Sequence, residues 1–281
     1  MTIAIEQLRQ WIGRSEQRHA RLDPVPAQAL AATLDRDDVL QDGEVLPAPY
    51  HWLYFLPAVP QSQLGVDGHP ARGGLLPPVP LPRRMWAGGR LSFLLPLRLG
   101  EQMSKRSEVI DVQHKSGKSG ELVFVTVQHR IFNADGVLAL EEEQDLVYRD
   151  APTASITAAA PPVEHRPAIW QRELRPDPVL LFRYSALSFN SHRIHYDLPY
   201  ATEVEGYPGL VVHGPLIATL LLDHLRRHSE PPLRSFEFKA VRPLIAGTTL
   251  RLCGQPGSGL ASLWAEDADG HICMQASARF G

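Results

Sequence analysis

A pair of short internal repeats constrains the fold of this chain more than any other feature of its sequence. The segment PLRLG at 96–100 is echoed by PLIAG at 243–247, and Ala-Asp-Gly at 134–136 is echoed by the same tripeptide at 268–270. The two offsets are 147 and 134 residues, so the first copy has a hairpin roughly 13 residues longer. The shared order indicates two copies of one unit. Segments rich in valine, leucine and phenylalanine from residue 90 onward predict that the unit is made mainly of strands.

The second copy alone contains a strong helix signal. The segment GPLIATLLLDHLRRHS begins with Gly214-Pro215, and proline suits the first turn of a helix. Arg226 and Arg227 suit its negative end. Its leucines cover more than one face, which predicts a helix enclosed by other elements. A helix wrapped by a long antiparallel sheet fits this order of elements.

The remaining segments divide the chain. The pattern of residues 3–18 predicts an opening helix, and 180–189 (LLFRYSALSF) predicts a strand. The proline-dense stretch that ends in GGLLPPVPLPRRMWAGG, at 73–89, predicts an extended surface connection, because each proline lacks a backbone donor. We expect an N-terminal domain at 1–150, a linker at 151–175 and a C-terminal domain at 176–281.

A polar cluster, FNSHRIHYD at 189–197, precedes the predicted helix. Polar side chains crowded against a core are costly unless they are paired or useful. His195 can exchange a proton at cellular pH, and Asn190 can orient a water molecule as donor and acceptor. The amide of Gly214 points out of a helix N-terminus, where positive charge collects, and the missing Cβ lets a substrate carbonyl approach. These residues predict acid–base chemistry beside an oxyanion site.

Other roles for these residues are open on the sequence alone. Imidazoles and a carboxylate are common metal ligands, so one alternative is a metal site formed by His192, His195, Asp197 and His213. His213 also suits a structural role at a helix start, and His195 suits a core position with satisfied hydrogen bonds. Lys239 and Arg242 suit a solvated strand edge.

The cluster resembles the MaoC-type enoyl-thioester hydratases, whose pattern is S-G-D-x-N-P-[IL]-H-x-D followed by VHG-M-L. The matching positions are Ser188, Ile194, His195, Asp197, Val212, His213, Gly214 and Leu216. Phe189, Asn190, His192 and Arg193 depart from the pattern, and the family's catalytic aspartate falls at Asn190. FRYSALSFN-x-HRIHYD, RMWAGG and PLRLG are closer to the subgroup of type 2 hydroxyacyl-thioester dehydratases and of mesaconyl-C4-CoA and itaconyl-CoA hydratases.

The resemblance implies an α+β double hot-dog fold: two repeats, an antiparallel sheet wrapped around a helix, and a degenerate N-terminal copy. It also implies a mechanism. Water held between Asn190 and His195 attacks the β-carbon of an α,β-unsaturated thioester, with His195 as general base, and the Gly214 amide stabilises the enolate oxygen. The same imidazole then protonates the α-carbon. Asp197 or the backbone must tune His195, and no metal or redox cofactor is required.

The substrate is less defined by the sequence. Lys239, Arg242 and Arg84 are candidates for the phosphates of a CoA or acyl-carrier thioester. Arg183 or Arg193 is a candidate for a free acyl carboxylate, and His213 is a further candidate for substrate binding. The leading hypothesis is a hydratase that converts itaconyl-CoA or mesaconyl-C4-CoA into citramalyl-CoA, as in itaconate degradation. The alternatives are a 3-hydroxyacyl-thioester dehydratase of fatty-acid synthesis, a thioesterase on the same fold and a binding module without chemistry.

The composition excludes several other classes of partner. A formal net charge of −3 gives no basic field that would attract nucleic acid or an anionic membrane. No apolar run of transmembrane length is present, and the first residues lack the apolar core of a signal peptide. Cys253 and Cys273 lack metal-type spacing and are expected to be reduced. We expect a cytoplasmic protein, either a homodimer or a single double-hot-dog unit.

Overall fold

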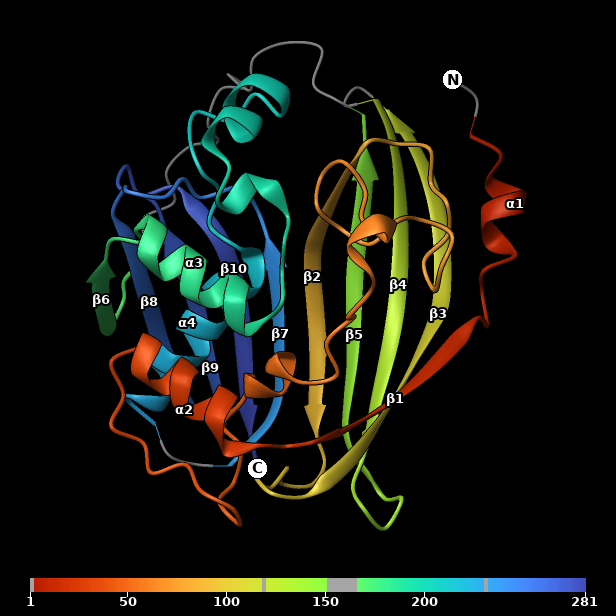
Figure 1. The fold of residues 1–281 in the computed structure, drawn as a ribbon. Coiled ribbons are helices and arrows are strands. Elements are labelled where there is room, and N and C mark those ends of the chain that lie inside the picture. The colour runs from red at the N-terminus through yellow and green to blue at the C-terminus, as the bar shows by residue number, and fades with distance from the viewer. Residues whose placement is uncertain (1–2, 118–119, 151–165, 230–231) are drawn as a thin grey trace.

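The computed structural model describes residues 3–117, 120–150, 166–229 and 232–281. In these residues ten strands form one antiparallel sheet, in the order β1-β3-β4-β5-β2-β7-β10-β9-β8-β6 (Figure 1). The first half contributes β1 (Ser15–Arg21), β2 (Arg83–Phe93), β3 (Gln102–Gly117), β4 (Gly120–Phe132) and β5 (Leu138–Arg149). The second half contributes β6 (Trp170–Leu174), β7 (Leu233–Ala240), β8 (Leu250–Gly257), β9 (Leu260–Glu266) and β10 (Ile272–Phe280).

The strand order confirms the internal duplication. Read from the outer edge inward, the first half runs β1-β3-β4-β5-β2 and the second runs β6-β8-β9-β10-β7, which is the same order of equivalent strands. The repeated segments 96–100 and 243–247 directly precede β3 and β8, and the two Ala-Asp-Gly turns connect β4 to β5 and β9 to β10. The longer hairpin expected in the first copy is β3–β4. The fold is therefore a double hot-dog.

The predicted central helix is α4, at Gly214–Arg226. Every residue from Leu216 to Leu225 is buried, and the helix packs against β8, β9, β10 and β2. The prediction of an enclosed helix in the second copy is confirmed. The longest helix in the described part of the first copy is α2 (Pro24–Thr33), which has ten residues. It does not occupy the position in the first copy that α4 occupies in the second (Figure 1).

The prediction of a strand at 180–189 is wrong, because this segment forms most of helix α3 (Pro178–Leu187). Asp177 caps this helix by accepting a hydrogen bond from the amide of Leu180 at 2.8 Å, and Pro178 fits the first turn. The same Asp-Pro-Val sequence starts α2, where Asp23 accepts from the amide of Val25 at 2.9 Å. The helices α2 and α3 pack on each other (Figure 1). The Asp-Pro-Val sequence, at 23–25 and 177–179, is a third repeat in the chain. It is a helix-start signal that overrides the strand propensity of the aromatic residues.

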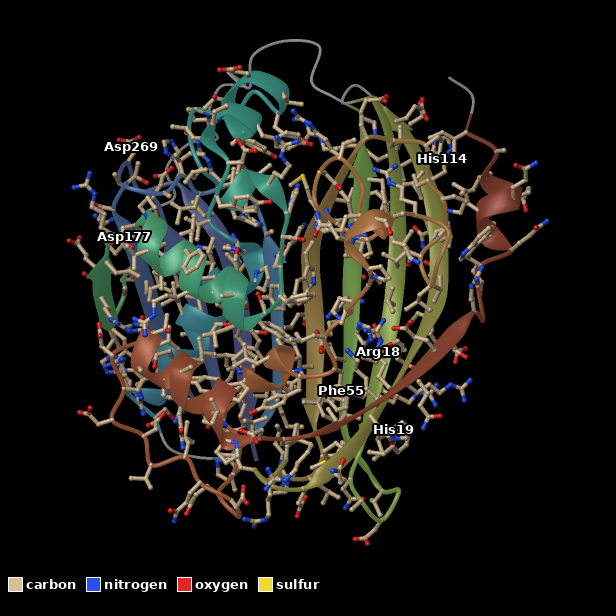
Figure 2. All side chains as sticks on the ribbon, in the orientation of Figure 1. Arg18, His19, Phe55, His114, Asp177 and Asp269 are labelled. Atoms are coloured by element: carbon tan, nitrogen blue, oxygen red, sulfur yellow. The ribbon has the colours of Figure 1, made fainter. Side chains whose placement is uncertain are left out.

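The opening helix is much shorter than predicted. Helix α1 covers only Ile5–Arg9, and β1 follows as an edge strand paired with β3. Side chains along β1 alternate in exposure, so Arg18 faces inward and donates to the carbonyl of Leu56 at 2.7 Å, while His19 points away (Figure 2). Pairing with β3 therefore overrides the local helical pattern of this segment.

The proline-rich segment is an extended connection only as far as Pro82. From Arg83 onward, part of the segment predicted as a connection forms β2, which pairs with β7 and so joins the two halves. Glycines permit this close pairing, because a Cβ on Gly88 would overlap the carbonyl oxygen of Phe238, and one on Gly89 would lie 2.8 Å from the Phe238 ring. The seam between the halves thus depends on the Ala-Gly-Gly sequence of β2.

Part of the predicted linker, residues 151–165, lies outside the described residues. Its last residues form the edge strand β6, which pairs with β8. In the described ranges, no helix combines the length and apolarity needed to cross a bilayer.

Candidate active site

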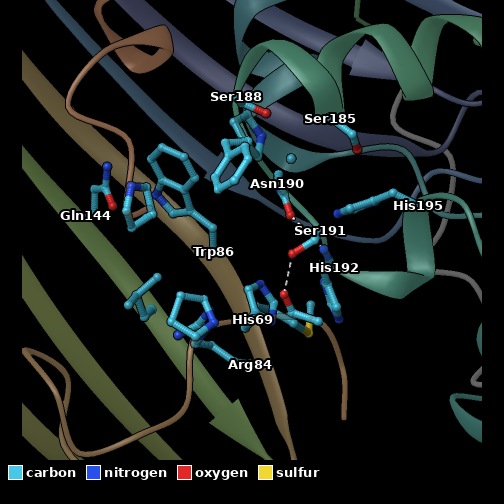
Figure 3. A pocket seen from close by; sticks show the side chains of 18 of the residues that line it. His69, Arg84, Trp86, Gln144, Ser185, Ser188, Asn190, Ser191, His192 and His195 are labelled. Carbon is cyan, nitrogen blue, oxygen red and sulfur yellow. Dashed lines mark hydrogen bonds between the residues drawn. The ribbon is translucent and has the colours of Figure 1, made fainter. Parts of the chain in front are cut away.

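A cavity of about 1540 Å³ lies between the two halves. One wall comes from the proline-rich segment and β2, and the other comes from residues 182–196 and the start of α4. This volume exceeds the 300 to 1000 Å³ that is roughly typical of small-ligand sites, so a long thioester arm fits. Figure 3 shows polar groups from both walls: Ser185, Asn190, His192 and His195 from the second half, and His69, Arg84 and Gln144 from the first.

His195 ends a short 3₁₀ turn, Arg193–His195, and lines the cavity. Its Nδ1 lies 2.7 Å from the carbonyl oxygen of Val211. A carbonyl only accepts, so Nδ1 carries the proton and Nε2 keeps a free lone pair. Burial lowers the pKa of His195 to about 4, against the smaller opposing effect of the Val211 hydrogen bond. The imidazole is therefore neutral at cellular pH and is a base.

His213 lies directly behind His195. Their rings stack with centroids 3.6 Å apart, and Nε2 of His213 lies 2.8 Å from the hydroxyl of Ser185. His213 is fully buried and does not line the cavity, and burial holds its pKa well below the usual range. The structure therefore places His213, a predicted substrate-binding residue, where it supports the ring of His195.

Asn190 lines the cavity at the end of helix α3. Its side-chain oxygen accepts a hydrogen bond from the backbone amide of His192 at 3.0 Å, which fixes the side chain in a local turn. The carboxamide NH₂ is then the group available to a ligand in the cavity. Asn190 can therefore donate to a water oxygen, but it cannot take up a proton.

Asp197 does not contact His195. Its carboxylate binds the guanidinium of Arg193 at 2.7 Å and accepts from the amide of Tyr200 at 3.1 Å. Asp197 is outside the cavity lining, and the Arg193 hydrogen bond lowers the pKa of its carboxyl. Of the two groups considered for tuning His195, the structure places the backbone carbonyl of Val211 in contact with the ring.

Gly214 starts α4, next to His213, and lines the cavity. Amides in the first turn of a helix have no intrahelical partner, so the Gly214 N–H lies where partial positive charge collects. A Cβ at this position would approach only the carbonyl oxygen of Trp86, at 3.8 Å. The predicted oxyanion donor and His195 therefore line one cavity.

The predicted substrate-binding cations are distributed unevenly. Arg84 and Arg242 line the cavity, and Arg242 is ion-paired with Asp267 at 3.4 Å. Arg193 is committed to Asp197, and its guanidinium lies 4.1 Å from the centre of the Tyr200 ring. The side chains of Arg183 and Lys239 are exposed and outside the lining. The structure thus brings two of the five predicted cations to the cavity.

Sequence reasoning missed the contribution of the first half. Asp67 and His69 lie close to the polar cluster at 189–197. His69 Nδ1 is 2.9 Å from the Asp67 carboxylate, and the centroids of the His69 and His192 rings are 4.1 Å apart. The only signal was an Asp-x-His pair inside a proline-rich segment, and nothing in that pattern indicates which distant residues it meets. Long-range packing, rather than a local motif, completes the site.

Asp67, His69 and His192 place possible metal-ligand atoms within 4.8 Å of one another. Both carboxylate oxygens of Asp67, however, already accept hydrogen bonds from His69: Oδ2 from the ring at 2.9 Å and Oδ1 from the backbone amide at 3.0 Å. The geometry is that of a hydrogen-bonded carboxylate–imidazole pair, so we assign no metal here. A second group, Asp267, Asp269 and His271, lies in the β9–β10 turn and outside the cavity lining.

The fold, with a histidine and an asparagine beside the N-terminus of a buried helix, defines a class: the MaoC-like hot-dog hydratases and dehydratases. A family model described as hydroxyacyl-thioester dehydratase type 2 matches residues 49–246. The chain belongs to this hydroxyacyl-thioester dehydratase type 2 family and is a hydro-lyase.

Curated relatives extend the likeness over nearly the whole chain. A mesaconyl-C4-CoA hydratase of Chloroflexus aurantiacus is 46% identical over 274 residues, which cover 96% of this chain and 97% of the relative. A mitochondrial hydroxyacyl-thioester dehydratase type 2 of Schizosaccharomyces pombe is 31% identical, over 83% of this chain and 87% of the relative.

Solved structures share the fold at low sequence identity. HtdX of Mycobacterium tuberculosis has a TM-score of 0.70 at 17% identity, over 95% of this chain and all of that chain. A MaoC-like dehydratase of Phytophthora capsici has a TM-score of 0.70 at 14% identity, over 99% of this chain and 98% of that chain. These likenesses support the double hot-dog architecture.

Proposed function

We propose that this protein adds water to an α,β-unsaturated or methylene dicarboxylyl-CoA thioester, converting mesaconyl-C4-CoA or itaconyl-CoA into citramalyl-CoA. The 46% identical relative is named for the hydration of mesaconyl-C4-CoA. CoA enters as part of the substrate, and the proposed chemistry uses no metal or redox cofactor. We place this activity in the cytoplasm.

The site residues support an acid–base mechanism. In the proposed reaction Asn190 donates to the oxygen of the attacking water, and the free Nε2 of His195 removes its proton as the C–O bond forms at the β-carbon. Negative charge moves onto the thioester oxygen, which the Gly214 amide stabilises. A general base of this kind contributes roughly 100- to 10,000-fold to a rate. Protonation of the α-carbon then completes the hydration of mesaconyl-C4-CoA. In itaconyl-CoA the double bond lies between the β- and γ-carbons, so it must first move into conjugation by loss of an α-proton and gain of a γ-proton.

One observation carries the dicarboxylyl assignment: Arg84 is a cation inside the cavity, and none of the ion pairs among the described residues includes it. Its neighbour Arg83, in contrast, is buried against Glu205 at 2.7 Å. A half-buried guanidinium without an acidic partner can bind an anion. We assign Arg84, a candidate for the CoA phosphates on the sequence alone, to an acyl carboxylate instead. In citramalyl-CoA and mesaconyl-C4-CoA that anion is the free carboxylate on the β-carbon.

The test compares substrates with and without this carboxylate. We expect Arg84→Gln to lower kcat/KM for mesaconyl-C4-CoA by roughly 10- to 150-fold, as expected for losing a charged hydrogen bond of about 1.5 to 3 kcal/mol. Its kcat/KM for crotonyl-CoA should change little. The matched control is Arg279→Gln, at an exposed position on β10. Loss of the conjugated-thioester absorbance measures each rate.

Preference of the wild-type enzyme for crotonyl-CoA by a large factor would contradict the dicarboxylyl assignment. That result would favour a second function, a 3-hydroxyacyl-thioester dehydratase of fatty-acid synthesis. The family model and the 31% identical Schizosaccharomyces pombe relative are both named hydroxyacyl-thioester dehydratase type 2.

A further inference from the structure

Hydrogen bonds fix the loop that contains Asp67 and His69 to the polar cluster at 189–197. The backbone amide of Arg193 donates to the carbonyl of Asp67 at 2.9 Å, and the hydroxyl of Ser191 donates to the carbonyl of Gly68 at 2.5 Å (Figure 3). Gly68 has a positive φ of 88°, and a Cβ there would overlap the carbonyl oxygen of Ser191. The first half therefore presents His69 to the cavity in one defined position.

Four imidazoles form a continuous row beside the cavity. The centroid distances are 4.1 Å from His69 to His192, 5.3 Å from His192 to His195 and 3.6 Å from His195 to His213. Among the described hydrogen bonds, only His69 has a carboxylate partner in this row, namely Asp67. A carboxylate on Nδ1 fixes the tautomer and stabilises the imidazolium. His69 is therefore the ring of this row whose bound proton has an anionic partner.

Hydration needs two proton transfers, one that removes a proton from water and one that adds a proton to the α-carbon. Asn190 cannot transfer a proton, and a protonated His195 would be a buried cation with only a backbone carbonyl as its hydrogen-bond partner. A base in these surroundings can take the proton of water, while the α-carbon requires a donor.

We propose that His69, oriented by Asp67, is a second catalytic residue, which gives the α-carbon its proton in hydration and removes it in dehydration. This assignment rests on the hydratase function proposed above. In hydration a C–O bond forms at the β-carbon, and the water proton passes to Nε2 of His195. The α-carbon of the enolate takes a proton from Nε2 of His69. After product release, the proton on His195 exchanges with solvent, and His69 takes up a proton from solvent when the next substrate binds.

The groups that face His69 explain how it receives this proton. Asp67, Arg84, Arg72 and His192 surround the ring, and burial, followed by the charge of Arg84, lowers its pKa to about 4. A substrate carboxylate bound to Arg84 neutralises the positive charge that lowers the pKa of His69. The attraction between the Asp67 carboxylate and the His69 imidazolium remains. Substrate binding therefore favours the protonated form of His69.

Hydrogen exchange at the α-carbon distinguishes the role proposed for His69 from the role proposed for His195. Citramalyl-CoA is incubated in D₂O with the full-length enzyme, and mass spectrometry follows deuterium in the substrate while absorbance follows dehydration. We expect His69→Gln to lower the rate of dehydration at least 100-fold and to abolish hydrogen exchange at the α-carbon. His195→Gln should lose dehydration to a similar extent but keep exchange, because His69 still removes the α-proton.

The chain supplies a matched control for the Asp–His pair. His271 binds Asp267 at 3.4 Å in the β9–β10 turn, and its side chain is 17% exposed, compared with 20% for His69. His271→Gln should change both rates by less than twofold. Asp67→Asn removes only the positioning carboxylate, so exchange should slow by at least tenfold, with a thermal unfolding midpoint like that of the wild type.

The outcomes distinguish the two proposals. Normal dehydration by wild type, combined with exchange that persists in His69→Gln and is lost in His195→Gln, would overturn the role of His69 and leave the hydratase function intact. If the wild type turned over neither citramalyl-CoA nor mesaconyl-C4-CoA, the proposed function and the role of His69 would both be overturned.

Discussion

At the scale of single residues, three histidines in or behind the wall of this cavity differ in their hydrogen-bond partners. His195 bonds to a backbone carbonyl, His69 to a carboxylate and His213 to a hydroxyl. The first arrangement leaves a neutral base, the second stabilises a cation, and the third holds a supporting ring. The hydrogen-bond partner on one nitrogen thus decides what the other nitrogen can do.

The residue-scale prediction concerns His195. His195→Gln should lower kcat for hydration by roughly 100- to 10,000-fold, because glutamine cannot take the proton of water. The control is His224→Gln, a buried histidine on α4 outside the cavity lining, which should retain hydration within about threefold. Stopped-flow absorbance gives both rates. Equal losses in the two variants would indicate damage to the fold rather than to the chemistry.

At the scale of elements, α4 combines a structural and a chemical role. Ten consecutive buried residues anchor the helix in the sheet, so its first amide is held rigidly at the cavity wall. Preorganised donors of this kind stabilise a developing oxyanion without reorganisation. The apolar surface of the helix therefore fixes the position of the amide that we propose as the oxyanion donor.

Gly214→Ala tests this arrangement. The new methyl group would meet only the Trp86 carbonyl, at 3.8 Å, so the unfolding midpoint should stay close to that of the wild type. In the cavity, however, it would stand beside the amide that binds the thioester oxygen. We expect kcat/KM to fall by roughly 10- to 100-fold, in line with a partial loss of the approximately 3 kcal/mol from one oxyanion donor. Unchanged kinetics would place the oxyanion site elsewhere.

The elements also show what could be predicted from the sequence. The repeat, the enclosed helix and the 189–197 cluster were predictable, because each is a local pattern. The strand predicted at 180–189 is instead part of helix α3, because the Asp177-Pro178 helix start outweighs the strand propensity of the aromatic residues. The pairing of β1 and the approach of His69 depend on segments about a hundred residues apart, and no local pattern encodes such contacts.

At the scale of the whole molecule, burial of neutral histidines ties stability to pH. Burial is the largest cause that lowers the pKa of six described histidines: His69, His129, His192, His195, His213 and His224. Between pH 6.5 and about 4 the unfolded chain takes up protons at these positions, and the folded chain does not. The free energy of unfolding is therefore highest above pH 6.5 and falls as the pH decreases.

Urea unfolding at pH 7.5, 6.0 and 5.0 measures this dependence. Each such histidine contributes up to about 1.4 kcal/mol per pH unit, so the stability should fall by several kcal/mol across this range. His129→Gln should flatten the dependence, whereas His19→Gln, at an exposed position on β1, should not. A free energy of unfolding that does not vary with pH would show that these rings are accessible to solvent.

The β2–β7 seam has a further consequence for how the enzyme behaves in dilute solution. Because both strands belong to one polypeptide, the two walls of the cavity meet at a local concentration that the bulk protein concentration does not alter. A noncovalent pair of hot-dog subunits loses its shared sites as it dissociates. This chain keeps its cavity assembled even at nanomolar levels, where its specific activity should match that of a concentrated sample.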